Sequence, residues 1–431
     1  MKPEIAVIGG GYAGLACAVA LARSGKVRVT VFEAGRVLGG RARVVARPDT
    51  PLDNGQHLLI GAYTQTLGLL RSVGVSPTVF ESLPLTLAYP DGFLLRAARL
   101  PAPLHLAVGI LRARGMSWAD RRAAARLIRH LRRLDWTVAP DRPVANLLLD
   151  AGQTPTMRER VWEPLCVAAL NTPVREASAQ VFANVLRDSL AAGASASELL
   201  IPRVDLSELF PVPATRWLGR RGHTIRTSDP IRGIRLEDGA FWLDGGPTWA
   251  GYHQVVVATA PYHAGALLEG FPALGDLTRS LGAMAYQPTI TVYLQFESAP
   301  PMPCPMMGLT GGPAQWLFDR HQAGGPAGLL AAVISGGGDH EALTHADLEL
   351  AVQRQIEQAF GRLPKVAWIQ TIAEKRATFA CTPGLARPAN VTAVDGLWLA
   401  GDYTRGPYPA TIEGAVRSGQ AAAGGVLSRL G

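Results

Sequence analysis

The first fourteen residues constrain the fold more than any other part of the chain. Residues 4–9 form an apolar, strand-like run, and Gly9, Gly11 and Gly14 follow it with the spacing G-x-G-x-x-G. In this pattern the first glycine permits a tight turn, the second lets backbone approach a pyrophosphate, and the third lets a helix pack closely on the sheet. The chain is therefore predicted to bind a dinucleotide at the N-terminus of its first helix.

The residues after the glycines support this prediction. Residues 15–24 are apolar at helical spacing, residues 27–32 form a second strand-like run, and Glu33 closes that strand. An acidic residue about 20 positions beyond the glycines is suited to hold the ribose hydroxyls of an adenine dinucleotide. The alternative is an ordinary glycine run that only packs a helix against a sheet.

The segment from Glu33 to Ala42 (EAGRVLGGRA) resembles the second fingerprint of the flavin amine oxidase and phytoene desaturase superfamily. The resemblance implies FAD as the cofactor, with Gly40 bringing backbone against it and Arg41 lying near the pyrophosphate. A guanidinium group complements phosphate oxygens, so the charge of Arg41 suits this position.

A third segment, residues 396–403 (GLWLAGDY), resembles a C-terminal fingerprint of the same superfamily. The resemblance implies that Gly401 and Asp402 bind the ribityl or pyrophosphate region of FAD. It also places Ile231 where family members contact adenine through their backbone. The two ends of the chain are therefore expected to share one cofactor.

Residues 408–419 continue the C-terminal fingerprint. The resemblance implies that a helix opens near Ile412 and Gly414 and points its N-terminus at the flavin ring. The positive end of a helix dipole there would stabilise negative charge on the reduced ring.

Together the fingerprints predict an α/β fold, with a Rossmann-like FAD-binding domain of the glutathione-reductase type, amine oxidase subgroup, and an interleaved α+β substrate domain. The length of 431 residues allows two to three domains, and a composition of 48% hydrophobic residues indicates a large core. We expect the FAD-binding domain to comprise residues 1–83, 202–265 and 385–431, and the substrate-binding domain to comprise residues 84–201 and 266–384.

Two further segments narrow the resemblance. Residues 53–63 (DNGQHLLIGAY) and 162–172 (WEPLCVAALNT) are similar to segments of the squalene-associated FAD-dependent desaturases, a family of hydroxysqualene dehydroxylases. The resemblance places Gln56 and His57 beside the flavin ring, with His57 or Glu163 as the donor of the proton that releases the hydroxyl group as water. In the alternative, Gln56 satisfies backbone groups in a turn and His57 packs as a neutral imidazole. The apolar residues within 162–172 are expected to line a lipid tunnel or, alternatively, to form helix core.

Three reactions are open to such a flavoenzyme: amine oxidation, isoprenoid desaturation, and reductive removal of an isoprenoid hydroxyl. Amine oxidases of this group commonly keep a lysine on the strand that corresponds to residues 289–296, and this segment has none. Tyr408 matches an aromatic position of the amine oxidase cage and keeps that alternative open, as the desaturase-like C-terminal segment does for phytoene-type desaturation. We expect reduced FAD to deliver hydride to an allylic carbon of hydroxysqualene and give squalene, a step of hopanoid and isoprenoid biosynthesis. A flavoprotein that only binds lipid would carry the same fingerprints.

The remaining composition narrows the partners. No second G-x-G-x-x-G follows a strand, so no dedicated NAD(P)H site is predicted and electrons must come from a separate, unidentified donor. The four cysteines are scattered without a C-x-x-C pair, which gives no support for a metal site or a disulfide framework. The net charge of +8 suggests nucleic acid only weakly, because the aromatic residues that single strands need are not interleaved with it. We expect no nucleic-acid partner.

An arginine-rich region raises the question of membrane contact. No run reaches the roughly 18 apolar residues of a membrane span, and no signal peptide precedes the first strand, so a cytoplasmic location is expected. Between Trp118 and Trp136, apolar residues recur at helical spacing and arginines lie largely on the other side. Such a helix can lie in the interface of a membrane, here the inner membrane face. Alternatively, it packs its apolar stripe on the substrate domain and exposes its arginines.

Overall fold

The computed structural model describes residues 2–45, 50–245 and 251–431. Its central element is a five-stranded parallel sheet in the order β10-β2-β1-β13-β19. The strands come from distant parts of the chain: β1 is Glu4–Ile8, β2 Arg28–Phe32, β10 Thr224–Arg226, β13 Gln254–Val257 and β19 Leu397–Leu399. The middle strands are almost wholly buried because helices and loops cover both faces, which explains their uninterrupted apolar sequence. The predicted Rossmann-like fold is confirmed.

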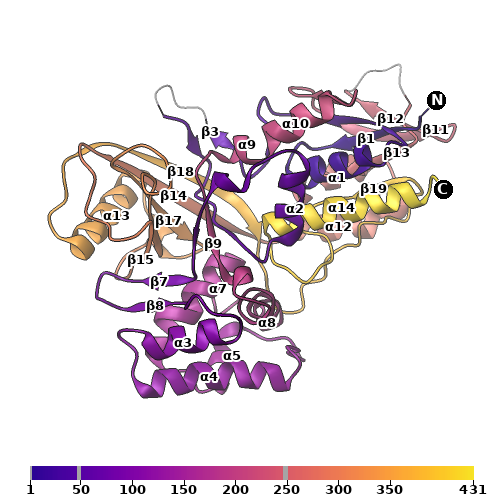
Figure 1. The fold of residues 1–431 in the computed structure, drawn as a ribbon. Helices are drawn as coiled ribbons and strands as arrows, with labels where there is room; N and C mark the ends of the chain where they lie inside the picture. The colour runs from indigo at the N-terminus through magenta and orange to yellow at the C-terminus, as the bar shows by residue number, and fades with distance from the viewer. Residues whose placement is uncertain (1, 46–49, 246–250) are drawn as a thin grey trace.

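Two long helices from opposite ends of the chain pack side by side on this sheet (Figure 1). They are α1, Tyr12–Arg23, and α14, Ile412–Ser428. Gly419 makes their close approach feasible, since a Cβ there would lie 2.1 Å from the Ala13 carbonyl oxygen. α9 (Leu206–Leu209) and α10 (Pro211–Gly219) lie beside α1, and the hairpin of β11 (Gly233–Glu237) and β12 (Ala240–Asp244) contacts α11 (Pro261–Leu268), which packs on α12 (Gly275–Gly282).

A second, antiparallel sheet has the order β15-β16-β17-β14-β18. Its strands are β15 Met306–Gly308, β16 Trp316–Asp319, β17 Leu329–Ser335, β14 Tyr286–Phe296 and β18 Val366–Phe379. The expected alternation of β14 is present: Val292 and Leu294 pack in one core with helix α13 (His345–Phe360), whereas Tyr293 belongs to the core on the opposite face. That opposite face contributes to the cavity described below.

The lower part of the molecule in Figure 1 is mostly helical, as predicted for the segment after residue 84. It contains α3 (Leu104–Arg112), α4 (Trp118–Arg133), α5 (Val144–Asp150), α6 (Pro155–Met157), α7 (Glu163–Leu170) and α8 (Ala179–Leu186), with a hairpin of β7 (Thr86–Ala88) and β8 (Leu94–Arg96).

Short elements join the parts. They are β3 (Val44–Val45) with β4 (Leu52–Asp53), the three-stranded sheet of β5 (Leu59–Ile60), β9 (Leu199–Pro202) and β6 (Phe80–Leu83), and helix α2 (Thr64–Ser72). Within the described residues, no helix is both long enough and apolar enough to cross a bilayer.

Candidate active site

A cavity of about 1150 Å³ opens at the carboxyl ends of β1, β2 and β13 and extends to the antiparallel sheet and to α7 and α8. This edge is where parallel α/β sheets bind their ligands. One half of the cavity wall is formed by the fingerprint glycines and by charged groups. The other half is formed by aliphatic and aromatic side chains, so the cavity combines a polar and an apolar compartment.

The three glycines of the first fingerprint have different local roles. Gly9 has a φ of +114°, and a Cβ on Gly14 would lie 1.9 Å from the Gly9 carbonyl oxygen, so both are required by the turn and by helix packing. Gly11 is different, because the nearest atom to its Cβ position is the Gly40 Cα at 3.8 Å and the residue lines the cavity. Gly11 also caps α1 without any side-chain hydrogen bond, which leaves backbone N–H groups of the first turn available to an anion.

Glu33 closes β2 at the same edge. Its carboxylate accepts hydrogen bonds from the backbone N–H of Gly10 at 2.8 Å and of Gly35 at 2.7 Å, so its orientation is fixed. Glu33 and Ile231 both line this end of the cavity. The structure thus brings together the acid expected at the ribose and the residue expected at the adenine.

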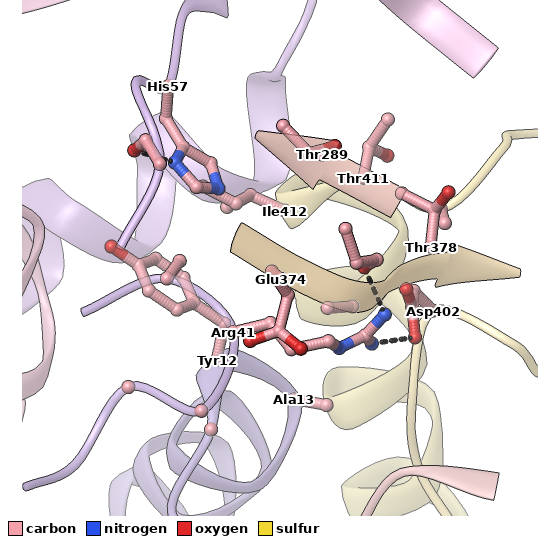
Figure 2. Close-up of a pocket in the computed structure, with 18 of the residues that line it drawn as sticks. Tyr12, Ala13, Arg41, His57, Thr289, Glu374, Thr378, Asp402, Thr411 and Ile412 are labelled. Carbon is pink, nitrogen blue, oxygen red and sulfur yellow. Dashed lines mark hydrogen bonds and ion pairs between the residues drawn. The ribbon is translucent and has the colours of Figure 1, made fainter. Parts of the chain in front are cut away.

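The second and third fingerprints meet through an ion pair (Figure 2). Arg41 donates to the Asp402 carboxylate at 2.6 Å and to the backbone carbonyl of Ala377 at 2.7 Å. Burial disfavours the Arg41 charge, but the attraction of Asp402 outweighs it and the pKa of Arg41 is raised. Gly40, Arg41, Gly401 and Asp402 all line the cavity. Residues 361 positions apart in sequence therefore form one wall.

Helix α14 begins where it was predicted, at Ile412, which lines the cavity. Thr411 caps it by accepting a hydrogen bond from the Gly414 N–H at 3.0 Å, so Gly414 belongs to the first turn and is not part of the lining. Glu413, in the first turn of the same helix, does not cap it. Its buried carboxylate accepts from the Thr66 N–H at 2.9 Å, and thus caps the neighbouring helix α2.

Gln56 and His57 lie in a turn against β14 and both line the cavity. The His57 Nδ1 is 2.8 Å from the Gly55 carbonyl, which can only accept, so Nδ1 carries the hydrogen and Nε2 is left as an acceptor. Burial, together with the charge of Arg41, lowers the pKa of His57. The imidazole is therefore neutral near pH 7.

The segment from Trp162 to Thr172 contributes both to helix core and to the cavity wall. Trp162 is helix core, with its Nε1 donating to Gln153 at 2.7 Å, whereas Leu165 and its neighbours Ala168 and Ala169 line the cavity. Asn171 also lines it and links α7 to the antiparallel sheet through Thr378. Glu163 has a pKa raised by burial, yet it is not one of the residues that line the cavity.

Most of the apolar half is built from residues that carried no signal in the sequence. Apart from α7, it includes Leu85 and Leu87 of the β7 region, Phe182 and Leu186 of α8, and Met306, Trp316 and Phe318 of the antiparallel sheet. Each looks like an ordinary core position of a helix or strand. Periodicity predicts that such a face is buried, but not that it faces a cavity.

Comparison with known proteins assigns the family. The model of the flavin containing amine oxidoreductases matches residues 12–427. The chain belongs to this family. It is accordingly an FAD-dependent oxidoreductase. Among solved structures, the cyclohexylamine oxidase of Brevibacterium oxydans shares the fold with a TM-score of 0.71 and 19% identity, each chain being fully covered.

Curated relatives of this flavoenzyme are more specific. It is 31% identical to the hydroxysqualene dehydroxylase of Sinorhizobium fredii and 32% identical to that of Rhodopseudomonas palustris, with 99% of each chain covered in both cases. The zeta-carotene desaturase of Synechocystis is 22% identical over 99% of this chain and 97% of its own length.

The polar half of the cavity fits FAD. Gly11 leaves space and free N–H groups where a pyrophosphate would lie, Glu33 and Ile231 would hold the adenosine end, and the guanidinium of Arg41, paired with Asp402, would lie near the phosphates. The N-terminus of α14 is directed into the same cavity through Ile412. The chemistry of the donor set, two helix N-termini and a guanidinium, is that of a site for a dinucleotide with negative charge.

Proposed function

We propose that this flavoenzyme removes the hydroxyl group of hydroxysqualene and releases squalene and water. The observation that carries the proposal is the 31–32% identity with two hydroxysqualene dehydroxylases over 99% of each chain. The apolar half of the cavity supports it, because a hydrocarbon chain needs a wall of this kind beside the cofactor. Bound reduced FAD would supply the hydride and, as it returns to oxidised FAD, the proton with which the hydroxyl group leaves as water.

The apolar wall has a chemical role as well as a binding role. Loss of an allylic hydroxyl develops positive charge on carbon, which water would trap. Side chains such as Leu87, Phe182 and Phe318 exclude water from that half of the cavity. The chain therefore contributes a dry compartment next to the polar one.

For His57 we propose positioning in place of the predicted proton donation. A neutral ring whose Nε2 accepts would take a hydrogen bond from the substrate hydroxyl and orient it. An acceptor loses function when pH falls below its lowered pKa, whereas an acid loses function when pH rises above it. The pH profile of turnover therefore separates the two roles. Glu163 lies outside the lining, so we assign it no part in the reaction.

A second candidate function is desaturation of a carotenoid, favoured by the zeta-carotene desaturase relatives at 20–22% identity. The same apolar compartment would accept such a substrate. Amine oxidation has less support: β14 carries no lysine, and its residues Thr289, Thr291 and Tyr293 stand on the face opposite the α13 core. The solved amine oxidases show likeness of fold alone.

We also propose that the chain divides into the two domains predicted above. We further propose that a separate electron donor reduces the FAD, and that the enzyme acts at a membrane surface, from which it takes an insoluble isoprenoid. In support of the division, every strand of the parallel sheet falls in residues 1–83, 202–265 or 385–431, and every strand of the antiparallel sheet in residues 266–384. Helix α12 packs on α11 beside the β11 hairpin, so we move the boundary predicted after residue 265 to residue 282.

The test is an anaerobic incubation of photoreduced enzyme with hydroxysqualene, and of oxidised enzyme with zeta-carotene or putrescine. The expected result is reoxidation of the flavin with formation of squalene in the first case and no flavin reduction in the others. A His57→Phe variant should retain FAD but turn over about 10- to 100-fold more slowly, because the hydroxyl is no longer oriented. Flavin reduction by either alternative substrate, with no response to hydroxysqualene, would overturn the proposal.

A further inference from the structure

The outward face of helix α3 is apolar and uncovered. Leu104 and Leu111 are 54% and 57% exposed, and Ala107 between them is exposed as well, so one side of the helix presents a hydrophobic stripe to solvent. Leu100 just before the helix is 39% exposed, and Trp118 just after it is 65% exposed. A contiguous apolar surface of this kind marks an interaction site in a soluble protein.

Helix α4, on which the sequence-based hypothesis of membrane contact rested, differs from α3 because its apolar face is buried. Its apolar residues Ala124, Leu127 and Leu131 are fully buried, so the alternative in which this stripe packs on the substrate domain is the one the structure shows. Arg121 of α4 donates to the carbonyls of Ile110 and Ala113 and thus joins the end of α3 to α4. The two helices therefore form one surface, with α3 providing its hydrophobic part.

The exposed charges of residues 96–133 have one sign. Residues 96–133 contain ten arginines and one aspartate, without lysine or glutamate, and the aspartate, Asp120, is buried in the cap of α4. Nine of the arginines are exposed, and none forms an ion pair within the described ranges of the chain: Arg96, Arg99, Arg112, Arg114, Arg122, Arg126, Arg129, Arg132 and Arg133. The surface therefore suits an anionic partner that also has an apolar layer.

The surface lies one layer from the apolar half of the cavity. Helix α3 packs on β8, β8 pairs with β7, and Leu87 of β7 lines the cavity together with Leu85 just before that strand (Figure 1). Only α3 and this hairpin therefore separate the surface from the apolar half of the cavity.

We propose that this surface, the exposed residues Leu100, Leu104, Ala107, Leu111 and Trp118 with the arginines around them, docks on an anionic lipid bilayer. The leucines enter the acyl boundary, Trp118 lies at the headgroup level, and the arginines contact lipid phosphates. The inference rests on the proposed function for its biological purpose, the supply of an isoprenoid, but not for its physical argument.

Vesicle sedimentation tests the docking with the holoenzyme. Wild type should bind vesicles of 30% phosphatidylglycerol in phosphatidylcholine at least 10-fold more tightly than vesicles of phosphatidylcholine alone. Leu104→Ser/Leu111→Ser should lose at least 10-fold of that binding. The matched control is Leu236→Ser/Leu350→Ser, which changes two leucines of similar exposure on β11 and α13 and should bind as wild type does.

Two further measurements complete the test. Amide hydrogen exchange of the wild type should slow at residues 100–118 when vesicles are added. Equal vesicle binding by wild type and the α3 double variant overturns the proposal, and so does the absence of vesicle binding by wild type. A wild-type dimer that the double variant converts to monomer also overturns it, because the surface would then be covered by a second copy of the chain. Turnover of detergent-solubilised hydroxysqualene is measured separately. Its absence alongside the expected vesicle binding would refute the proposed reaction and leave the docking intact.

Discussion

Substitution of Gly11 and Gly14 should have opposite effects on cofactor binding and on folding. A Cβ on Gly11 makes only ordinary contact, 3.8 Å from the Gly40 Cα, and its extended backbone at φ −76° accepts valine without strain. The valine methyl groups would enter the cavity where the pyrophosphate is expected. A Cβ on Gly14 would lie 1.9 Å from the Gly9 carbonyl oxygen, so backbone must move.

The magnitudes follow from these distances. Gly11→Val should change the free energy of unfolding of the apoprotein by no more than about 1 kcal/mol, the usual range at a helix N-cap. It should remove one or two hydrogen bonds to a charged phosphate, about 3 kcal/mol, which weakens FAD binding about 100-fold. Gly14→Ala should destabilise the apoprotein by at least about 1–3 kcal/mol, the range for overpacking.

The assay is titration of each apoprotein with FAD by flavin fluorescence, beside urea unfolding followed by circular dichroism. Gly424→Ala is the control, since nothing lies within 4 Å of its Cβ position in α14. It should leave the FAD affinity at its wild-type value and raise the free energy of unfolding by no more than about 1 kcal/mol, the difference in helix propensity between glycine and alanine. Wild-type FAD affinity in Gly11→Val would refute the placement of the pyrophosphate. Wild-type stability in Gly14→Ala would refute the argument from helix packing.

Three further predictions concern single side chains. Glu33→Ala should weaken FAD binding about 10- to 100-fold by loss of hydrogen bonds to the ribose, with Glu33→Gln intermediate in the same fluorescence titration; equal affinities would remove Glu33 from the site. Burial raises the pKa of Asp53 to about 7 in the folded protein. The contribution of the Asp53 carboxyl to the free energy of unfolding is therefore complete below its unfolded-state pKa of 3.8 and is lost as pH rises from about 4 to 7. Asp53→Asn, which keeps an acceptor for the Leu206 N–H, should therefore be about 2–4 kcal/mol more stable than wild type at pH 8, and urea unfolding at pH 5 and 8 that shows no difference between the proteins would contradict this. Glu413→Ala should lower the free energy of unfolding by about 2–4 kcal/mol, because it leaves the N-terminus of α2 uncapped. Arg417→Ala removes the ion-pair partner of Glu413, a side chain that is 37% exposed, and should lower it by under about 1 kcal/mol. Equal losses of the two variants on urea unfolding would show that the ion pair, not the cap, stabilises the two helices.

Local sequence was sufficient to predict the glycine turn at the start of the parallel sheet and the acid that closes its second strand. The turn at Gly9, the close approach at Gly14 and the acid at Glu33 are requirements of a few bonded neighbours, so they appear as fixed spacings. The opening of α14 at Ile412 was implied by the family resemblance and is confirmed. The family resemblance placed Arg41 and Asp402 at one cofactor, but their ion pair was not predicted, because no spacing within the chain indicates a pair 361 residues apart.

Tertiary structure alone decided how each predicted face is used. The charge state of His57 depends on the Gly55 carbonyl and on the nearby Arg41, and Glu413 caps a helix 347 residues away in place of its own. Periodicity predicted an amphipathic α4, yet its stripe is covered while that of α3 is exposed. The physical reason is that a sequence pattern specifies which side chains share a face of a helix or strand, whereas the packing of distant segments determines whether that face meets core, cavity or solvent.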